Sequence, residues 1–130
     1  MPEDTLVEVT DKTFEKIVEK GEKPVIVMFY SPNCPFCHSI EPYFRQYAKE
    51  FAGEVTFARI NIGANLWTAE RFGVRGTPTF KFFCNGRPVS DMVGAVYPTL
   101  LKRMIEEGLK NGEECVKNST AIDYDISGYG

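Results

Sequence analysis

Two cysteines separated by a proline and a phenylalanine are the residues of this 130-residue chain best suited to chemistry: Cys34, Pro35, Phe36 and Cys37. The apolar segment 24–30 before them is rich in β-branched and aromatic residues, which predicts a buried strand. Apolar residues then return at spacings of three and four, which predicts an amphipathic helix over 34–51. Cys34 therefore falls at the helix N-cap and Pro35 at the first helical position, where a missing N–H is harmless.

This position activates the first thiol. A side chain at the N-cap accepts hydrogen bonds from amides of the first turn, here those of Phe36 and Cys37, and the helix dipole adds partial positive charge. Both effects favour a thiolate, so we expect the pKa of Cys34 to fall from about 8.5 into the range of roughly 3.5–7.5. Cys37 is then the resolving thiol of a reversible disulfide, because so short a loop gives a disulfide little stabilising value.

A zinc site is the main alternative for such a pair. A structural zinc needs four ligands, usually from two paired clusters. Cys84 and Cys115 stand alone, and His38 directly follows Cys37, so the sequence shows no second cluster. We therefore expect no metal and no cofactor. We expect Cys84 to be a small buried apolar residue and Cys115 a free thiol, with an intermolecular bridge as the alternative for Cys115.

Composition describes an ordinary soluble domain, with 43% hydrophobic and 25% charged residues and no apolar run of membrane-spanning length. Residues 1–5 are acidic and lack the pattern of a signal peptide, so we expect a cytoplasmic protein, and we expect it to be a monomer. No basic stripe offers a surface to nucleic acid.

The charge is unevenly distributed along the chain. Acidic and basic residues balance over 1–111, and the net charge of −3 comes from residues 112–130. We expect one domain over 1–111 and a loosely ordered acidic tail over 112–130. A tail that packs along the domain or docks a partner stays open.

Strand and helix patterns alternate along the domain. Strands are expected over 6–9, 24–30, 55–61, 79–84 and 87–93, and helices over 34–51, 65–72 and 98–109. A further helix after the first strand is expected to be capped by Thr10 or Asp11 and to end at Gly21. The pair Asn85-Gly86 predicts a tight hairpin turn. The order βαβαβ and then ββα predicts an α/β fold with a central mixed sheet flanked by helices.

Further motifs accompany the cysteine pair: Pro42 in the helix, the segments 57–61, 74–79 and 93–95, and the Asn85-Gly86 turn. With these, the chain from about Leu6 to Leu109 resembles the thioredoxin family. The resemblance implies the thioredoxin fold and a cis peptide bond between Thr77 and Pro78. It also implies a substrate groove around Cys34, whose backbone pairs with an extended substrate. The groove residues would be Gly76, Thr77, Pro78 and Gly94.

Three positions depart from the usual family pattern. The spacer Pro35-Phe36 is closer to that of glutaredoxins. Met28 stands where many relatives bury an acidic residue, which leaves the proton acceptor of the second thiol open, with Glu41 as a candidate. His38 stands where relatives often carry Lys or Arg; its imidazole would favour the thiolate, or it is simply solvated. Pro35, Phe36 and His38 are therefore candidate supports of the active site.

The resemblance implies an enzyme, a thiol–disulfide oxidoreductase that reduces disulfides in client proteins. An upstream reductase or a small-thiol reductant would restore the Cys34–Cys37 dithiol. Two alternatives stay open. One is a glutaredoxin-like reductase that uses glutathione or another small thiol. The other is an adaptor that binds partners through its groove and tail, although an adaptor has no need of paired thiols. Neither a membrane nor a nucleic acid is an expected partner.

Overall fold

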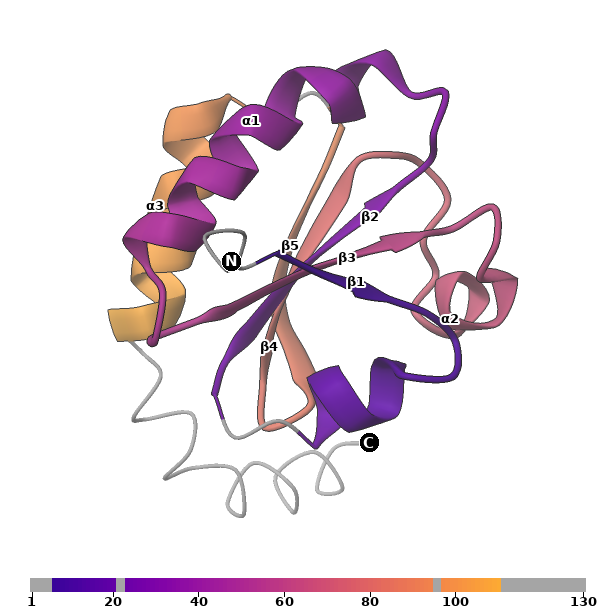
Figure 1. The fold of residues 1–130 in the computed structure, drawn as a ribbon, viewed down its shortest axis with the longest axis horizontal. Coiled ribbons are helices and arrows are strands. Elements are labelled where there is room, and N and C mark those ends of the chain that lie inside the picture. Colours follow the sequence, from indigo (N-terminus) through magenta and orange to yellow (C-terminus); the bar gives the residue numbers. More distant parts are fainter. Residues whose placement is uncertain (1–5, 21–22, 95–96, 111–130) are drawn as a thin grey trace, which may run out of the picture.

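A five-stranded sheet with helices on both faces forms the centre of the molecule (Figure 1). The computed structural model describes residues 6–20, 23–94 and 97–110. The strands are β1 (Leu6–Val9), β2 (Val25–Tyr30), β3 (Thr56–Asn61), β4 (Thr79–Cys84) and β5 (Arg87–Val93). The helices are the π-wound η1 (Glu15–Glu19), α1 (Pro35–Glu50), α2 (Leu66–Arg71) and α3 (Pro98–Lys110).

The sheet is mixed, as the sequence predicts. Its order is β1-β3-β2-β4-β5, in which β3 pairs parallel with both β1 and β2, and β4 pairs antiparallel with both β2 and β5. The predicted α/β architecture is therefore confirmed. The central strand β2 is buried on both faces, which explains why it appears in the sequence as a continuous apolar run.

Side chains that alternate along the strands build a separate core on each face. In β4, Phe82 packs with Leu101 and Ile105 of α3 in the core that also contains the buried face of α1. The next residue, Phe83, points to the other face and packs with Phe14, which precedes η1. Figure 1 shows α1 and α3 side by side on one face of the sheet. Both faces of the sheet are thus covered, which holds the end of β2 and the start of α1 in place.

A glycine allows α3 to lie directly on β4. A Cβ atom built on Gly108 would lie 2.5 Å from the ring of Phe82, which is fully buried. Alanine ordinarily favours a helix over glycine by about 1 kcal/mol. At position 108 this gain in helix stability is outweighed by overpacking, which costs about 1–3 kcal/mol, because the Phe82 ring cannot move without disturbing the core.

We therefore expect Gly108→Ala to lower the free energy of unfolding, measured by urea denaturation. Glu106→Ala, at an exposed position of the same helix, is the control and should leave stability nearly unchanged. A Gly108→Ala protein as stable as the parent would mean that α3 does not pack this closely on the sheet.

The first helix differs from the prediction. It is expected to be capped by Thr10 or Asp11, but its N-cap is Phe14, which makes no side-chain cap, and it winds as a π-helix. The Thr10 hydroxyl caps only the turn that precedes the helix, where it accepts a hydrogen bond from the Lys12 N–H at 3.3 Å. The Asp11 carboxylate instead accepts hydrogen bonds from the backbone N–H and the hydroxyl of Thr68, in α2, at 2.9 and 2.6 Å. The Asp11 side chain, which the local sequence predicts as a helix cap, therefore makes a tertiary contact instead. The expected end of this helix, Gly21, lies outside the described residues.

The other element boundaries agree with the sequence to within one or two residues. The β4–β5 turn has positive φ angles of 56° at Asn85 and 81° at Gly86, as its hairpin requires. β5, at the edge of the sheet, contains a bulge at Val89, because Phe83 pairs with Pro88 while Phe82 pairs with Ser90. The tail predicted over 112–130 lies outside the described residues, so its order stays a prediction.

Candidate active site

The cysteine pair lies at the N-terminus of α1, as the sequence predicts. Cys34 is the N-cap residue, in an extended conformation with φ −93° and ψ 111°, and Pro35 opens the helix. The backbone N–H of Cys37 donates a hydrogen bond to the Cys34 sulfur at 3.1 Å. Both thiols are largely enclosed, with 7% of Cys34 and 3% of Cys37 exposed. The N-cap geometry predicted for the first thiol is confirmed.

The two thiols differ in acidity. Burial alone would raise the pKa of Cys34, but hydrogen bonds from the side chains of Cys37 and Thr77, and from the first-turn amides, lower it overall. Burial, and then the hydrogen bond with Cys34, raise the pKa of Cys37 to about 11. Near neutral pH, Cys34 is therefore the thiol prepared to ionise, while Cys37 keeps its proton.

A second segment, which leads into the neighbouring strand β4, lies beside the cysteine pair. The Thr77-Pro78 peptide bond is cis, which confirms the expectation taken from the resemblance. The Thr77 side chain acts on both sulfurs, since its hydroxyl favours the ionised form of each and so lowers the pKa of each thiol. The Gly94 N–H donates to the Pro78 carbonyl at 2.9 Å, so these segments are held together. Among the described residues, none hydrogen-bonds the backbone N–H or C=O of Thr77.

Exposed apolar side chains surround this segment. Phe36, in the spacer of the cysteine pair, is 55% exposed, and Val93, at the end of β5, is 66% exposed. Val93 lies beside Gly76, where a Cβ would come within 3.9 Å of its methyl group. Sequence reasoning missed Val93 as a site residue. The signal was its position directly before Gly94.

The hydroxyl of Thr77 makes a test possible. Valine has nearly the same shape but cannot donate a hydrogen bond, so Thr77→Val removes one donor from the Cys34 thiolate. A hydrogen bond to a charged group contributes about 1.5–3 kcal/mol, so we expect the pKa of Cys34 to rise by about one unit or more. The ultraviolet absorbance of the thiolate, followed against pH in the reduced protein, measures this.

Thr79→Val is the matched control, since the Thr79 hydroxyl donates to the Gly76 carbonyl at 2.7 Å and not to a sulfur. Its titration should follow that of the parent chain. An unshifted Cys34 titration in Thr77→Val would show that this hydroxyl does not stabilise the thiolate.

His38 lies on the exposed side of the first turn. Its Nε2 atom is 2.7 Å from the carbonyl oxygen of Pro32, in the loop that leads to Cys34. This contact ties the helix to the loop in front of it. The predicted effect of the imidazole on the thiolate stays a prediction.

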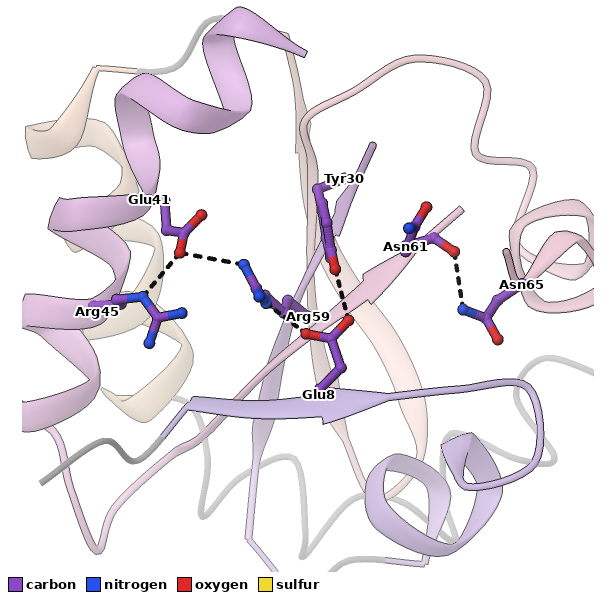
Figure 2. A network of polar contacts seen from close by, with 7 residues as sticks. All are labelled: Glu8, Tyr30, Glu41, Arg45, Arg59, Asn61 and Asn65. Atoms are coloured by element: carbon purple, nitrogen blue, oxygen red, sulfur yellow. Dashed lines mark hydrogen bonds and ion pairs between the residues drawn. The ribbon is translucent and has the colours of Figure 1, made fainter. Parts of the chain in front are cut away.

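A network of charged and polar side chains joins α1 to three strands (Figure 2). The Arg59 guanidinium contacts the carboxylates of Glu8 at 2.6 Å and Glu41 at 3.2 Å. Arg45 also contacts Glu41, at 2.8 Å. The Tyr30 hydroxyl donates to Glu8 at 2.7 Å, and burial followed by this hydrogen bond raises the pKa of Tyr30 to about 12. Glu41 is thus fixed by two guanidinium groups, one turn of helix beyond Cys37.

Cys84 is not part of the site, since it lies at the far end of β4. Cys84 is buried, as predicted, but it is disulfide-bonded, so the prediction of a simple apolar residue is wrong. Cys115, predicted as a free thiol, lies outside the described residues. In the part of the chain that the structure describes, no group of His, Cys, Asp or Glu could hold a metal ion.

Comparison with known proteins identifies the family. The family model Thioredoxin matches residues 5–107. Thioredoxin 1 of Nostoc sp. is 33% identical over 102 residues, which cover 78% of this chain and 95% of the relative. The thioredoxin of Haemophilus influenzae is 34% identical over a segment of the same extent. The chain belongs to the thioredoxin family. A chloroplastic M-type thioredoxin of Brassica napus is also 33% identical, but the match spans only 58% of that protein.

Membership confirms the thioredoxin fold and makes the chain a thiol–disulfide oxidoreductase. The structure also shows what occupies the position of the acidic residue that many thioredoxins bury. Met28 lies there, fully buried and beside Arg59 of the neighbouring strand in register. The carboxylates that contact Arg59 come from Glu8 of β1 and Glu41 of α1. No helix of the described residues is long and apolar enough to cross a membrane.

Proposed function

We propose that the chain reduces disulfide bonds in other proteins, with Cys34 as the nucleophile and Cys37 as the resolving thiol. The observation that carries the proposal is the opposite displacement of the two thiol pKa values, lowered at Cys34 and raised at Cys37. Because of this difference in pKa, Cys34 can attack as a thiolate, while Cys37 stays protonated until the mixed disulfide has formed.

The reaction proceeds in two exchanges. The Cys34 thiolate attacks one sulfur of the client disulfide, and the other client sulfur leaves as a thiolate. Cys37 then loses its proton and attacks the Cys34 sulfur, which releases the second client sulfur. Two electrons pass from the Cys34–Cys37 pair to the client, so the pair ends as a disulfide and the client as a dithiol.

The groove beside the sulfurs suits an extended client segment. The Thr77 backbone, next to the cis Pro78, offers an N–H and a C=O to a peptide strand. Gly76 and Gly94 border it without side chains that would block a backbone. Phe36 supplies exposed apolar surface beside the attacking sulfur. Clients are therefore proteins whose disulfide lies in an accessible, extended and partly apolar segment.

The Cys34–Cys37 disulfide must be reduced to the dithiol after each cycle. We propose an upstream reductase as the donor, in a reducing compartment such as the cytoplasm, with the chain acting as a monomer. Two electrons and two protons from the donor convert the Cys34–Cys37 disulfide back to the dithiol.

Insulin reduction tests the function. The purified full chain should accelerate the precipitation of reduced insulin when a small dithiol serves as electron donor. The same assay with thioredoxin reductase and NADPH, and separately with glutathione and glutathione reductase, identifies the donor. We expect turnover with the first system. Turnover with glutathione alone would favour the glutaredoxin-like alternative, and no turnover with any donor would contradict the proposal.

We further propose Glu41 as the group that accepts the Cys37 proton, through water. Glu41 lies one turn beyond Cys37 on the same helix, and its carboxylate is held by Arg45 and Arg59. Glu41→Gln should slow the resolving step by roughly 10²-fold, the lower end of what general-base catalysis contributes, and move its pH dependence upward. Rapid-quench release of a client thiol from the mixed disulfide measures this step.

Glu8→Gln is the matched control, since Glu8 also binds Arg59 but comes from β1 rather than from the helix of Cys37. Its resolving step should keep the parental pH profile. Identical profiles for the two variants would remove Glu41 from the mechanism.

A further inference from the structure

The side chains of Asp11 and Asn65 cap each other's segments rather than their own. Asn65 is the N-cap residue of α2, but its side chain does not cap that helix. Its Oδ1 atom instead accepts a hydrogen bond from the Asp11 N–H at 2.9 Å. The Asp11 carboxylate in turn accepts from the N–H and the hydroxyl of Thr68, the third residue of α2. Asp11 thus satisfies a first-turn amide of α2, although it lies 57 residues from Thr68 in the chain.

We propose that Asp11 and Asn65 are positioning residues of the redox site, which hold α2 and, through the segment that follows it, keep Thr77 beside the two sulfurs. They act through Thr77 rather than on the reacting atoms. The inference rests on the role proposed for Cys34 as the nucleophile, and it adds residues from the opposite face of the sheet to the groups that support this thiolate.

Hydrogen bonds, rather than apolar packing, hold the start of α2. The helix has six residues, too few to be stable alone, and its first two, Leu66 and Trp67, are exposed. Asn65 and Thr68 are buried, so their polar atoms need partners within the protein. Asn65 also donates from Nδ2 to the Asn61 carbonyl oxygen at 2.9 Å, which fastens the helix to the end of β3 (Figure 2). These contacts therefore fix where the helix begins.

The chain between α2 and Thr77 is short. The Val74 N–H donates to the Ala69 carbonyl at 2.9 Å, so the chain stays attached to the helix as far as Val74. Thr77 is three residues further on, and none of the described residues hydrogen-bonds its backbone N–H or C=O. On its other side the chain enters β4 at Thr79. The position of the Thr77 hydroxyl therefore depends on where α2 and β4 lie.

The position of this hydroxyl matters for the chemistry. The Thr77 side chain favours the ionised form of both thiols. A hydrogen bond weakens steeply as its length and angle depart from their preferred values. A small displacement of α2 therefore lowers the thiolate fraction of Cys34 without any change in the cysteine pair itself.

Titration of the Cys34 thiolate in Asp11→Ala tests the proposal, with the ultraviolet absorbance of the reduced full chain followed against pH. We expect the thiolate fraction at a fixed pH below the pKa to fall by roughly threefold, because the Thr77 hydroxyl loses part of a hydrogen bond to a charged group. Asn65→Ala should shift the titration in the same direction. Asp11→Asn, whose amide oxygen can still accept from Thr68, should titrate like the parent. An unchanged titration in Asp11→Ala would overturn the proposal.

A double variant separates positioning through Thr77 from a general loss of stability. In a Thr77→Val background, Asp11→Ala should cause no further fall in the thiolate fraction, because the hydroxyl through which Asp11 acts is gone. A merely structural role would lower the free energy of unfolding but would not depend on the residue at position 77. An equal fall in both backgrounds would therefore show that Asp11 does not act through Thr77.

Thr10→Ala is the matched control, since the Thr10 hydroxyl contacts Lys12 and Thr13 in the loop before η1. It should leave the thiolate titration unchanged. Should Asp11→Ala fail to fold, Thr68→Val removes one of the two Asp11 contacts at nearly constant volume. Its thiolate fraction should also fall, and an unchanged titration would overturn the proposal. Inactivity of the parent chain in the insulin assay would contradict the proposed function but would leave these titrations as they are.

Discussion

Cys34→Ser should abolish disulfide reduction, with a loss on the order of 10³-fold or more in the insulin assay. A serine oxygen would still receive the hydrogen bonds of the N-cap, but a hydroxyl does not ionise near neutral pH and cannot form an S–S bond. The large effect follows because every electron that reaches the client passes through this one sulfur.

Misfolding of Cys34→Ser would also abolish activity, so the fold of the variant has to be checked. Circular dichroism and the melting temperature of the reduced protein should stay close to those of the parent, since the serine retains the N-cap preference of the helix. Ser39→Ala, at an exposed position of the same helix, should keep full activity. Retention by Cys34→Ser of even a tenth of the parental activity would place the chemistry elsewhere.

Cys37→Ser should stop the reaction halfway rather than prevent it. Cys34 can still attack a client, because the amides and the Thr77 side chain still stabilise its thiolate. The mixed disulfide then has no neighbouring thiol to resolve it, so it accumulates. We expect turnover to fall on the order of 10²-fold, with a covalent complex that survives a non-reducing gel and disappears with a small dithiol.

The double variant Cys34→Ser/Cys37→Ser is the control for this trap. It should capture no client, because it lacks the attacking sulfur. Complexes of equal yield with the single and the double variants would mean that clients are bound through another cysteine. Failure of Cys37→Ser to form any complex would contradict the assignment of Cys37 as the resolving thiol.

The features that local sequence specifies were predicted well. The apolar run of β2, the proline after Cys34 and the periodicity of α1 each act within a few residues, so the N-cap position of the attacking thiol could be deduced without a structure. The Asn85-Gly86 turn is equally local, because both residues readily adopt the positive φ that such a hairpin needs.

The features that were missed depend on residues far apart in the chain. Asp11 fits the pattern of a cap, but its carboxylate is used by Thr68, 57 residues away. The contact between Glu8 and Arg59 depends on the register of β1 with β3, which sets the two residues side by side. Disulfide pairing also depends on residues far apart in the chain, because cysteine spacing alone does not determine which sulfurs are close in the fold.

The edge strand β5 affects how readily extended or unfolded chains can pair with the sheet. An edge strand presents unpaired N–H and C=O groups, along which other copies of the protein or client chains could add as further strands. Here β5, on the outside of the sheet, carries Pro88, which has no N–H to give, and its run is broken at Val89. β5 is therefore a poor template for a further strand, which would favour the release of a client once its disulfide bond has been reduced.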